Sequence, residues 1–144
     1  MVAREGSCGF TVVELLAVVS IMGVFAAVVL VSLHNARIKA RDAKRVSDVR
    51  QIMTALELFF NSNNRYPPGA ADRPVLTEGS PALSTFLQAY PSYPAPANDG
   101  GCGAAQYAYV QGTAGGSYTL TFCLGRGTGS LEAGHHTASQ DGIQ

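Results

Sequence analysis

One acidic side chain, Glu14, lies within an apolar stretch that runs from Phe10 to Leu33. A charged side chain near the centre of a bilayer costs about 2.5–3.5 kcal/mol on insertion scales, so an acidic residue in such a stretch is a candidate functional group. Gly9 and Phe10 form a glycine–phenylalanine junction at the start of the stretch, one helical turn ahead of the carboxylate. We therefore treat Gly9, Phe10 and Glu14 as one candidate site.

The apolar stretch itself has the length of a membrane span. It contains about 24 residues, or roughly 36 Å of helix, which is enough to cross a bilayer with some tilt. An ordinary secretory signal does not fit, because the stretch is too long and no small-x-small cleavage site follows it. A lipoprotein signal does not fit either, because no apolar run precedes Cys8.

The pattern after the span predicts that the same helix continues. Apolar residues recur mostly at steps of three or four, which places them on one stripe of a helix: Ile38, Val46, Val49, Ile52, Met53, Leu56, Phe59 and Phe60. We expect the opposite face to carry Arg41, Lys44, Asp48 and Gln51. Asp42 and Arg45 are helical neighbours, so these charges can pair locally. The prolines that follow Tyr66 cannot continue a helix, so the helix should end near Asn61–Asn64.

The rest of the chain has a different composition, with all 7 prolines and all 6 tyrosines at or after Tyr66. Alternating aromatic and β-branched residues predict strands over Gln106–Val110 and Ser117–Leu124, joined as a hairpin. Pro81–Gln88 is a candidate short helix. A two-stranded hairpin is only marginally stable alone, so we expect it to pack on the second half of the long helix.

The short polar leader, the Gly9–Phe10 junction, Glu14 and the uninterrupted span together resemble the N-terminal segment of the type IV pilins and type II secretion pseudopilins. The resemblance covers roughly the first 60 residues, and its weight comes from the combination of features rather than from the dipeptide alone. It implies that a prepilin peptidase cleaves between Gly9 and Phe10 and methylates the new amino terminus of Phe10. It also implies that Glu14 pairs with the α-amino group of Phe10 in an adjacent subunit and so sets the register of assembly.

The expected fold class is α+β and pilin-like, with a long N-terminal helix, membrane-spanning in its first half, packed on a small antiparallel β-sheet head. We divide the chain into a prepilin leader at 1–9, a transmembrane and filament-core half of the helix at 10–33, an amphipathic half at 34–62, and a small β-rich head with a polar C-terminal tail at 63–144.

The resemblance also implies a function. The protein is expected to be a structural subunit, a pilin or major pseudopilin, that polymerises into a type IV filament or a type II secretion pseudopilus. Its expected partners are other copies of itself, minor pilins, the prepilin peptidase, the assembly platform with its ATPase, and membrane lipid before assembly. The alternative is a single-span, membrane-anchored exported binding domain that never polymerises.

The expected location is the cytoplasmic membrane, with a single span and the C-terminal head outside, followed by a periplasmic or extracellular filament. Basic residues are concentrated directly after the span, at Arg37, Lys39, Arg41, Lys44, Arg45 and Arg50. The positive-inside rule would make this cluster cytoplasmic. The resemblance implies the reverse, and two cysteines in the C-terminal part favour an exported setting.

The basic cluster has three possible roles: a solvated helix face, contact with lipid headgroups, or contact with DNA. Within a filament it would also find acidic partners on neighbouring subunits. Nucleic-acid binding is not expected, because no aromatic residues are interleaved with the cluster and Asp42 and Asp48 dilute its charge.

Removal of Cys8 with the leader would leave Cys102 and Cys123. Their pairing would close a loop of about 22 residues and contribute roughly 3 kcal/mol. It would resemble the C-terminal disulfide loop of many type IV pilins. Two free thiols remain the alternative.

Neither a metal, a cofactor nor an enzymatic activity is expected. His135 and His136 are adjacent in a segment that we interpret as a flexible polar tail, and no carboxylate pair lies at ligand spacing. Asp99 and Asp141 are too sparse to form the calcium site found in the C-terminal loop of some secretion pseudopilins. No nucleophile–base set or paired catalytic carboxylates appear, and the glycine-rich segment 125–129 is predicted to be a turn.

Overall fold

The structure is a computed structural model that describes residues 9–103 and 106–144. Most of the expected leader, including Cys8, lies outside the described residues. The chain divides into two compact units, Met1–Ala36 and Arg37–Gln144, and each is described by itself.

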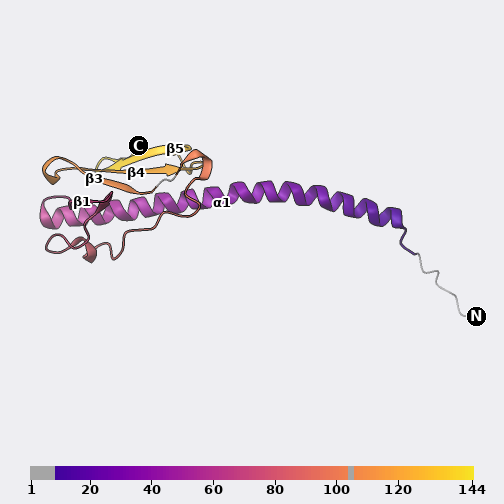
Figure 1. The fold of residues 1–144 in the computed structure, drawn as a ribbon, viewed down its shortest axis with the longest axis horizontal. Coiled ribbons are helices and arrows are strands. Elements are labelled where there is room, and N and C mark those ends of the chain that lie inside the picture. Colours follow the sequence, from indigo (N-terminus) through magenta and orange to yellow (C-terminus); the bar gives the residue numbers. More distant parts are fainter. Residues whose placement is uncertain (1–8, 104–105) are drawn as a thin grey trace, which may run out of the picture. The chain divides into compact units, whose positions relative to one another are not determined.

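The longest element is helix α1, Val12–Asn63, of 52 residues (Figure 1). It confirms the long continuous helix that the periodicity predicts. The helix ends as expected, because Asn64 adopts a left-handed backbone conformation with φ 53° and two prolines follow Tyr66. Asn and Asp tolerate this conformation better than most other residues.

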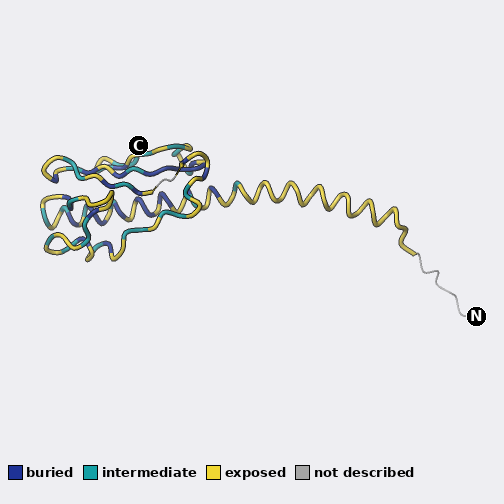
Figure 2. Tube along the Cα trace, in the orientation of Figure 1, coloured by how far each residue is buried: buried dark blue, intermediate teal, exposed yellow. Residues whose placement is uncertain are grey.

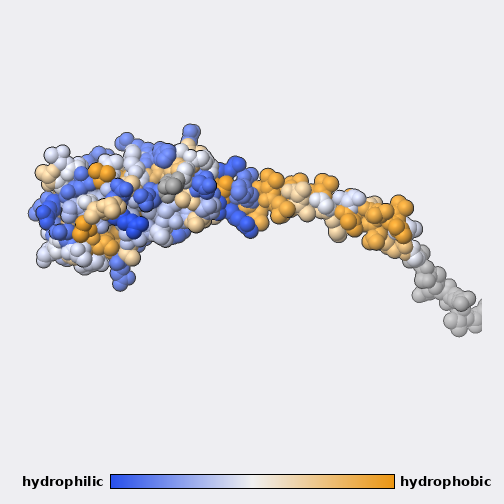
Figure 3. Space-filling model, in the orientation of Figure 1, coloured by the Kyte–Doolittle hydropathy of each residue, from blue (hydrophilic) through white to orange (hydrophobic). Residues whose placement is uncertain are grey.

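In the first unit, the apolar residues of α1 up to Leu33 are exposed along the whole stretch (Figure 2). Hydrophobic side chains cover its surface (Figure 3). Within the part of the chain that the structure describes, this is the one helix long and apolar enough to cross a membrane.

The second unit contains a four-stranded antiparallel sheet in the order β3-β4-β5-β6. Its strands are β3 (Ala108–Gln111), β4 (Tyr118–Leu124), β5 (Gly134–Ser139) and β6 (Gly142–Ile143). The predicted hairpin is confirmed by β3 and β4, with Tyr109 opposite Leu120. A separate two-stranded ladder joins β1 (Gly69–Ala70) to β2 (Arg73–Pro74).

The core of the second unit lies between α1 and this sheet. The predicted helical stripe is buried, and Val49, Leu56 and Phe59 have no exposed surface. They belong to one cluster with residues of β4, such as Leu120 and Phe122. The α+β fold with a long helix packed on a small antiparallel sheet is therefore confirmed.

Three short 3-10 helices lie in the connections: η1 (Leu83–Thr85), η2 (Asp99–Gly101) and η3 (Thr113–Gly115). The first lies within the segment expected to be a short helix, and it buries Leu83. Leu87 is also buried just after it.

The prediction of a flexible tail around His135 and His136 was wrong. These residues lie in β5, which pairs with β4, and β6 then pairs with β5. Alternation of apolar residues is weak there because Ala138 is the only residue of β5 that is fully buried. Backbone pairing, rather than side-chain burial, orders this segment.

Candidate functional site

Glu14 is held by its own chain at the start of α1. The backbone N–H of Thr11 donates to Glu14 Oε2 at 2.9 Å, and the Thr11 hydroxyl donates to the same oxygen at 2.8 Å. In return, the backbone N–H of Glu14 donates to Thr11 Oγ1 at 3.2 Å. This reciprocal pattern is a capping box, which satisfies amide groups that the first helical turn leaves unpaired.

The capping box was missed in the sequence, although Thr11-Val12-Val13-Glu14 carries its signature. The expectation for Glu14 was instead a pairing with the α-amino group of Phe10 in an adjacent subunit. Gly9 and Phe10 precede the helix and are exposed, Phe10 to 73 %. The structure thus places Gly9 and Phe10 just ahead of α1 and Glu14 in its first turn, where the carboxylate accepts hydrogen bonds from Thr11.

A second cluster of charges is buried at the start of the second unit. Asp42 and Arg45 have no exposed surface, and Arg45 Nη1 donates to Asp42 Oδ1 at 2.7 Å. Arg45 Nη2 also donates to Asp99 Oδ2 at 3.1 Å. Arg41 binds Asp99 with a second guanidinium, through Nη2 to Oδ1 at 2.8 Å. These four residues form the charge network of the head.

The network also fixes a loop of the sheet to α1. The carboxylate of Asp42 accepts hydrogen bonds from the backbone N–H groups of Gly125 at 2.9 Å and Arg126 at 2.8 Å. A side chain at Gly125 would not fit, because its Cβ would lie 2.7 Å from Asp99 Cβ. The glycine-rich turn after β4 is therefore a docking point for the helix.

Charge pairing also lowers the pKa of Asp99 from 3.8. The principal cause is its hydrogen bond from Arg41, which outweighs the opposing effect of burial. Nearby, the Tyr107 hydroxyl donates to Asp48 Oδ2 at 2.8 Å, and burial followed by this bond raises the pKa of Tyr107. The ionised form of Asp99 is thus the form that the folded head favours.

One expectation about these charges was wrong, because Asp48 was placed on the face opposite the buried stripe but is itself buried. The local pairing of Asp42 with Arg45 is confirmed, and Arg41 pairs with Asp99 of the same chain. A signal was present in the sequence. Asp42 and Arg45 lie seven and four residues before Val49, which is the spacing of the buried stripe itself.

A disulfide joins Cys102 to Cys123, and both residues are buried. Cys102 follows η2 directly, and its backbone N–H donates to the carbonyl of Asp99 at 3.0 Å. The bond therefore ties the loop that carries Asp99 to strand β4, close to the point where the charge network holds the same loop to α1.

We expect reduction of the Cys102–Cys123 disulfide, or its replacement by two serines, to cost roughly 3 kcal/mol, because the sequence separation of 21 residues closes a sizeable loop. For a head of this size, that corresponds to a fall in Tm on the order of 10–20 °C. Circular dichroism melting of the full chain in detergent, with and without reductant, measures it. The serine variant should show no response to reductant. Full alkylation of both cysteines in unreduced exported protein would contradict the bond.

The two adjacent histidines do not converge. His136 stacks on Phe122 with 5.5 Å between ring centroids, and its Nε2 lies 2.9 Å from the carbonyl oxygen of Glu132. His135 is exposed. Over residues 9–103 and 106–144, no group of three or more His, Cys, Asp or Glu side chains is placed to hold a metal ion.

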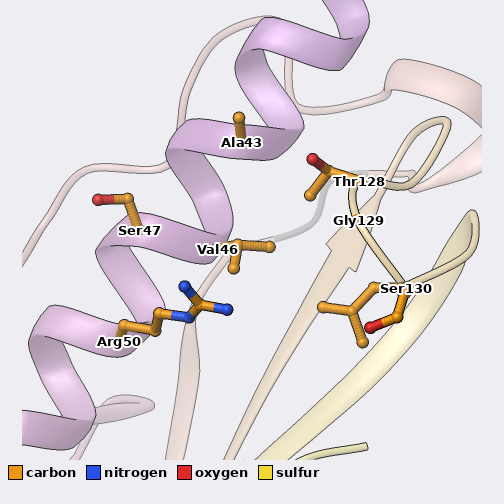
Figure 4. A pocket seen from close by; sticks show the side chains of 8 residues that line it. Ala43, Val46, Ser47, Arg50, Thr128, Gly129 and Ser130 are labelled. Atoms are coloured by element: carbon orange, nitrogen blue, oxygen red, sulfur yellow. The ribbon is translucent and has the colours of Figure 1, made fainter.

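A hollow of about 470 Å³ lies between α1 and the loop after β4 (Figure 4). Val46 and Arg50 extend toward Thr128 and Ser130, whereas Ser47 points away from the loop. The polar side chains among the lining residues are three hydroxyls and one guanidinium, with no carboxylate or imidazole.

Comparison with known proteins gives several similar chains, all named type II secretion system core protein G. The protein from Klebsiella michiganensis is 38 % identical over 64 residues, which are 44 % of this chain and 45 % of that protein. The Aeromonas hydrophila protein is 36 % identical over 44 % of this chain and 45 % of its own length. The Klebsiella pneumoniae protein is 32 % identical over 58 % of this chain and 59 % of its own length.

The resemblance to the pilin and pseudopilin family is confirmed. The chain spans about half the length of the curated pseudopilin relatives that it matches. No protein-family model matches the chain. No solved structure matches it significantly.

Proposed function

We propose that this protein is a pseudopilin-like structural subunit that is processed by a prepilin peptidase and polymerises into a type II secretion pseudopilus or a related filament. The observation that carries the proposal is its similarity to several proteins named type II secretion system core protein G. The exposed apolar stretch of α1 supports it, because such a surface requires either lipid or other copies of itself to cover it.

Processing is proposed to occur between Gly9 and Phe10. Both residues lie ahead of α1, outside regular secondary structure, and are exposed, so a protease can take this segment in an extended form. Gly9 has no side chain, which permits close approach of the backbone to a binding site. The new α-amino group on Phe10, after methylation, would then lie one turn from Glu14.

Assembly is proposed to pair Glu14 with the Phe10 amine of a neighbouring subunit. A charge buried without a partner is costly, so subunits that pack out of register would leave two unpaired charges in an apolar bundle. The penalty discriminates against incorrect packing more than it strengthens correct packing. Glu14 would thus select the register, while the apolar residues of 10–33 supply the contact area.

The remaining assignments of segments and partners follow from the same proposal. Residues 10–33 would anchor the subunit in the cytoplasmic membrane before assembly and form the filament core afterwards, and 34–62 would connect this core to the head. The head would lie outside. The proposed partners are further copies of the chain, minor pilins, the peptidase, and the assembly platform with its ATPase.

We expect Gly9→Ala to leave a longer precursor in the membrane, because the added methyl group would interfere with the peptidase rather than with the fold. A Cβ at Gly9 meets no other atom within 4 Å. Gly23→Ala is the matched control, since a Cβ there also meets nothing within 4 Å, and this variant should be trimmed normally.

Intact-mass measurement of the membrane and sheared fractions decides the result. A mature amino terminus other than Phe10 in the wild-type protein would overturn the processing site. Retention of residues 1–9 together with a monomeric state would instead favour the non-polymerising anchored domain.

A further inference from the structure

The exposed cations Arg37, Lys39 and Arg126 form a basic collar at the start of the head. The first two lie on α1, whereas Arg126 comes from the loop after β4, which is distant in sequence. Lys39 and Arg126 line the same hollow of about 640 Å³. The fold therefore adds a third cation to a group that the sequence places on the helix alone.

The position of Arg126 is set by its backbone. Its N–H donates to the carboxylate of Asp42, one turn along α1 from Lys39, at 2.8 Å. The side chain of Arg126 takes no part in this bond and is exposed. The collar is thus built on a fixed backbone, with its guanidinium and ammonium groups available to a partner.

The acidic residues nearby do not neutralise the collar. Asp42 and Asp99 are buried and bound by the guanidinium groups of Arg45 and Arg41. Glu132 is the only acidic residue among those that line the hollow. Two exposed cations, Lys39 and Arg126, therefore share this hollow with one exposed carboxylate. Arg37 is exposed two residues before Lys39, so the collar carries net positive charge.

The collar begins immediately after the apolar stretch. Arg37 is four residues from Leu33, so even a fully extended chain separates them by no more than about 14 Å. This distance is comparable with the Debye length of about 8–10 Å at physiological ionic strength, so salt would only partly screen the attraction between the collar and lipid charges at the end of the apolar stretch. Along α1, Figure 3 shows hydrophobic residues giving way directly to hydrophilic ones.

We propose that the basic collar binds the phosphate groups of anionic phospholipids while the subunit is held in the membrane. This inference rests on the membrane anchoring in the proposed function. Cations next to a span attract anionic lipid, with an effect of about fivefold in affinity per residue near the surface. The collar would hold the base of the head against the outer leaflet until the subunit is extracted into the filament.

The test uses the full chain in neutral micelles that contain equal amounts of phosphatidylglycerol and phosphatidylcholine. Native mass spectrometry of retained lipids should show enrichment of phosphatidylglycerol on the wild-type protein. The K39Q/R126Q variant should lose about fivefold or more of this enrichment, and salt should weaken it in the wild type. Both side chains are exposed, so circular dichroism melting should show an unchanged head.

The matched control is R65Q/R73Q, which also removes two exposed cations. Both follow the end of α1, which lies about 40 Å along the helix from Arg37, and neither lines the hollow of Lys39 and Arg126. The variant should therefore keep its preference for phosphatidylglycerol. Equal enrichment in K39Q/R126Q and wild type, or equal losses in both double variants, would overturn the inference. A change in self-association without a change in lipid preference would overturn it in favour of a second copy.

Carbonate extraction of membranes separates this test from the proposed function. A chain that carbonate releases has no membrane anchor, which would overturn both. A chain that resists extraction but shows no preference for phosphatidylglycerol would overturn the collar inference alone.

Discussion

Replacing Glu14 with leucine is expected to leave membrane insertion intact or improved while abolishing efficient filament assembly. Removal of the carboxylate relieves an insertion cost of up to about 3 kcal/mol. In the proposed filament, it also leaves the amine of Phe10 on the neighbouring subunit without a partner. Loss of one member of a buried ion pair typically costs about 3–5 kcal/mol, which corresponds to a loss of roughly two to four orders of magnitude in association. The measurement compares sheared polymer with membrane-held subunit.

The capping box makes a sharper control available. Glutamine also serves at this position of a capping box, so Glu14→Gln keeps a hydrogen bond to the Thr11 backbone but removes the charge. Thr11→Ala does the opposite, since it removes the hydroxyl that contacts Glu14 and keeps the carboxylate. We expect Glu14→Gln to fail in assembly as Glu14→Leu does, and Thr11→Ala to assemble. Wild-type yield from Glu14→Gln would show that the residue acts as a helix cap only.

Asp42→Ala is expected to destabilise the head by about 3–5 kcal/mol, because it breaks one buried pair and leaves Arg45 with less compensation. It also leaves the backbone N–H groups of Gly125 and Arg126 without their acceptor. For a head of this size, Tm should fall by more than about 10 °C. Circular dichroism melting of the full chain in detergent measures the change.

Two further variants test the cause. Lys44→Gln removes an exposed partner of Asp48, and it should change stability by less than about 1 kcal/mol because its ammonium group is largely solvated. Asp42→Leu combined with Arg45→Met removes both buried charges. The double variant should therefore lose less free energy of unfolding than the sum of the losses in the two single variants. A loss of less than about 1 kcal/mol in Asp42→Ala would contradict the importance of the charge network.

The long helix and the β3–β4 hairpin could be predicted from sequence because their signals are local. A repeat of three to four residues places Val49, Leu56 and Phe59 on one face, and two-residue alternation identifies Tyr118–Leu124 as a strand. Strands β5 and β6 lack such alternation. They are ordered by pairing with the edge of β4, a partner that no local pattern identifies.

The local pair of Asp42 and Arg45 could be predicted from its helical spacing, but its burial in a charge network could not, because charged residues on a helix are usually solvated. Asp42 and Arg45 do have the spacing of the buried stripe, but their burial depends on Asp99 and Gly125, which are more than 50 residues away. Long-range contacts of this kind follow from the fold. Glu14 was identified from its position in the apolar stretch. Its bond to Thr11 was also predictable, because the four residues from Thr11 to Glu14 form a capping-box motif.

In the proposed pathway, the bond between Thr11 and Glu14 would allow a subunit to remain in the membrane before assembly. A carboxylate that already accepts two hydrogen bonds from its own chain is less exposed to the hydrocarbon than a bare one. Polymerisation would then exchange the hydrogen bonds of Glu14 with Thr11 for an ion pair with the neighbouring Phe10 amine. The free energy gained from this pairing would be the difference between the two bonded states. Subunits of this kind would accumulate in the bilayer before assembly, and they would return to the bilayer when a filament is dismantled.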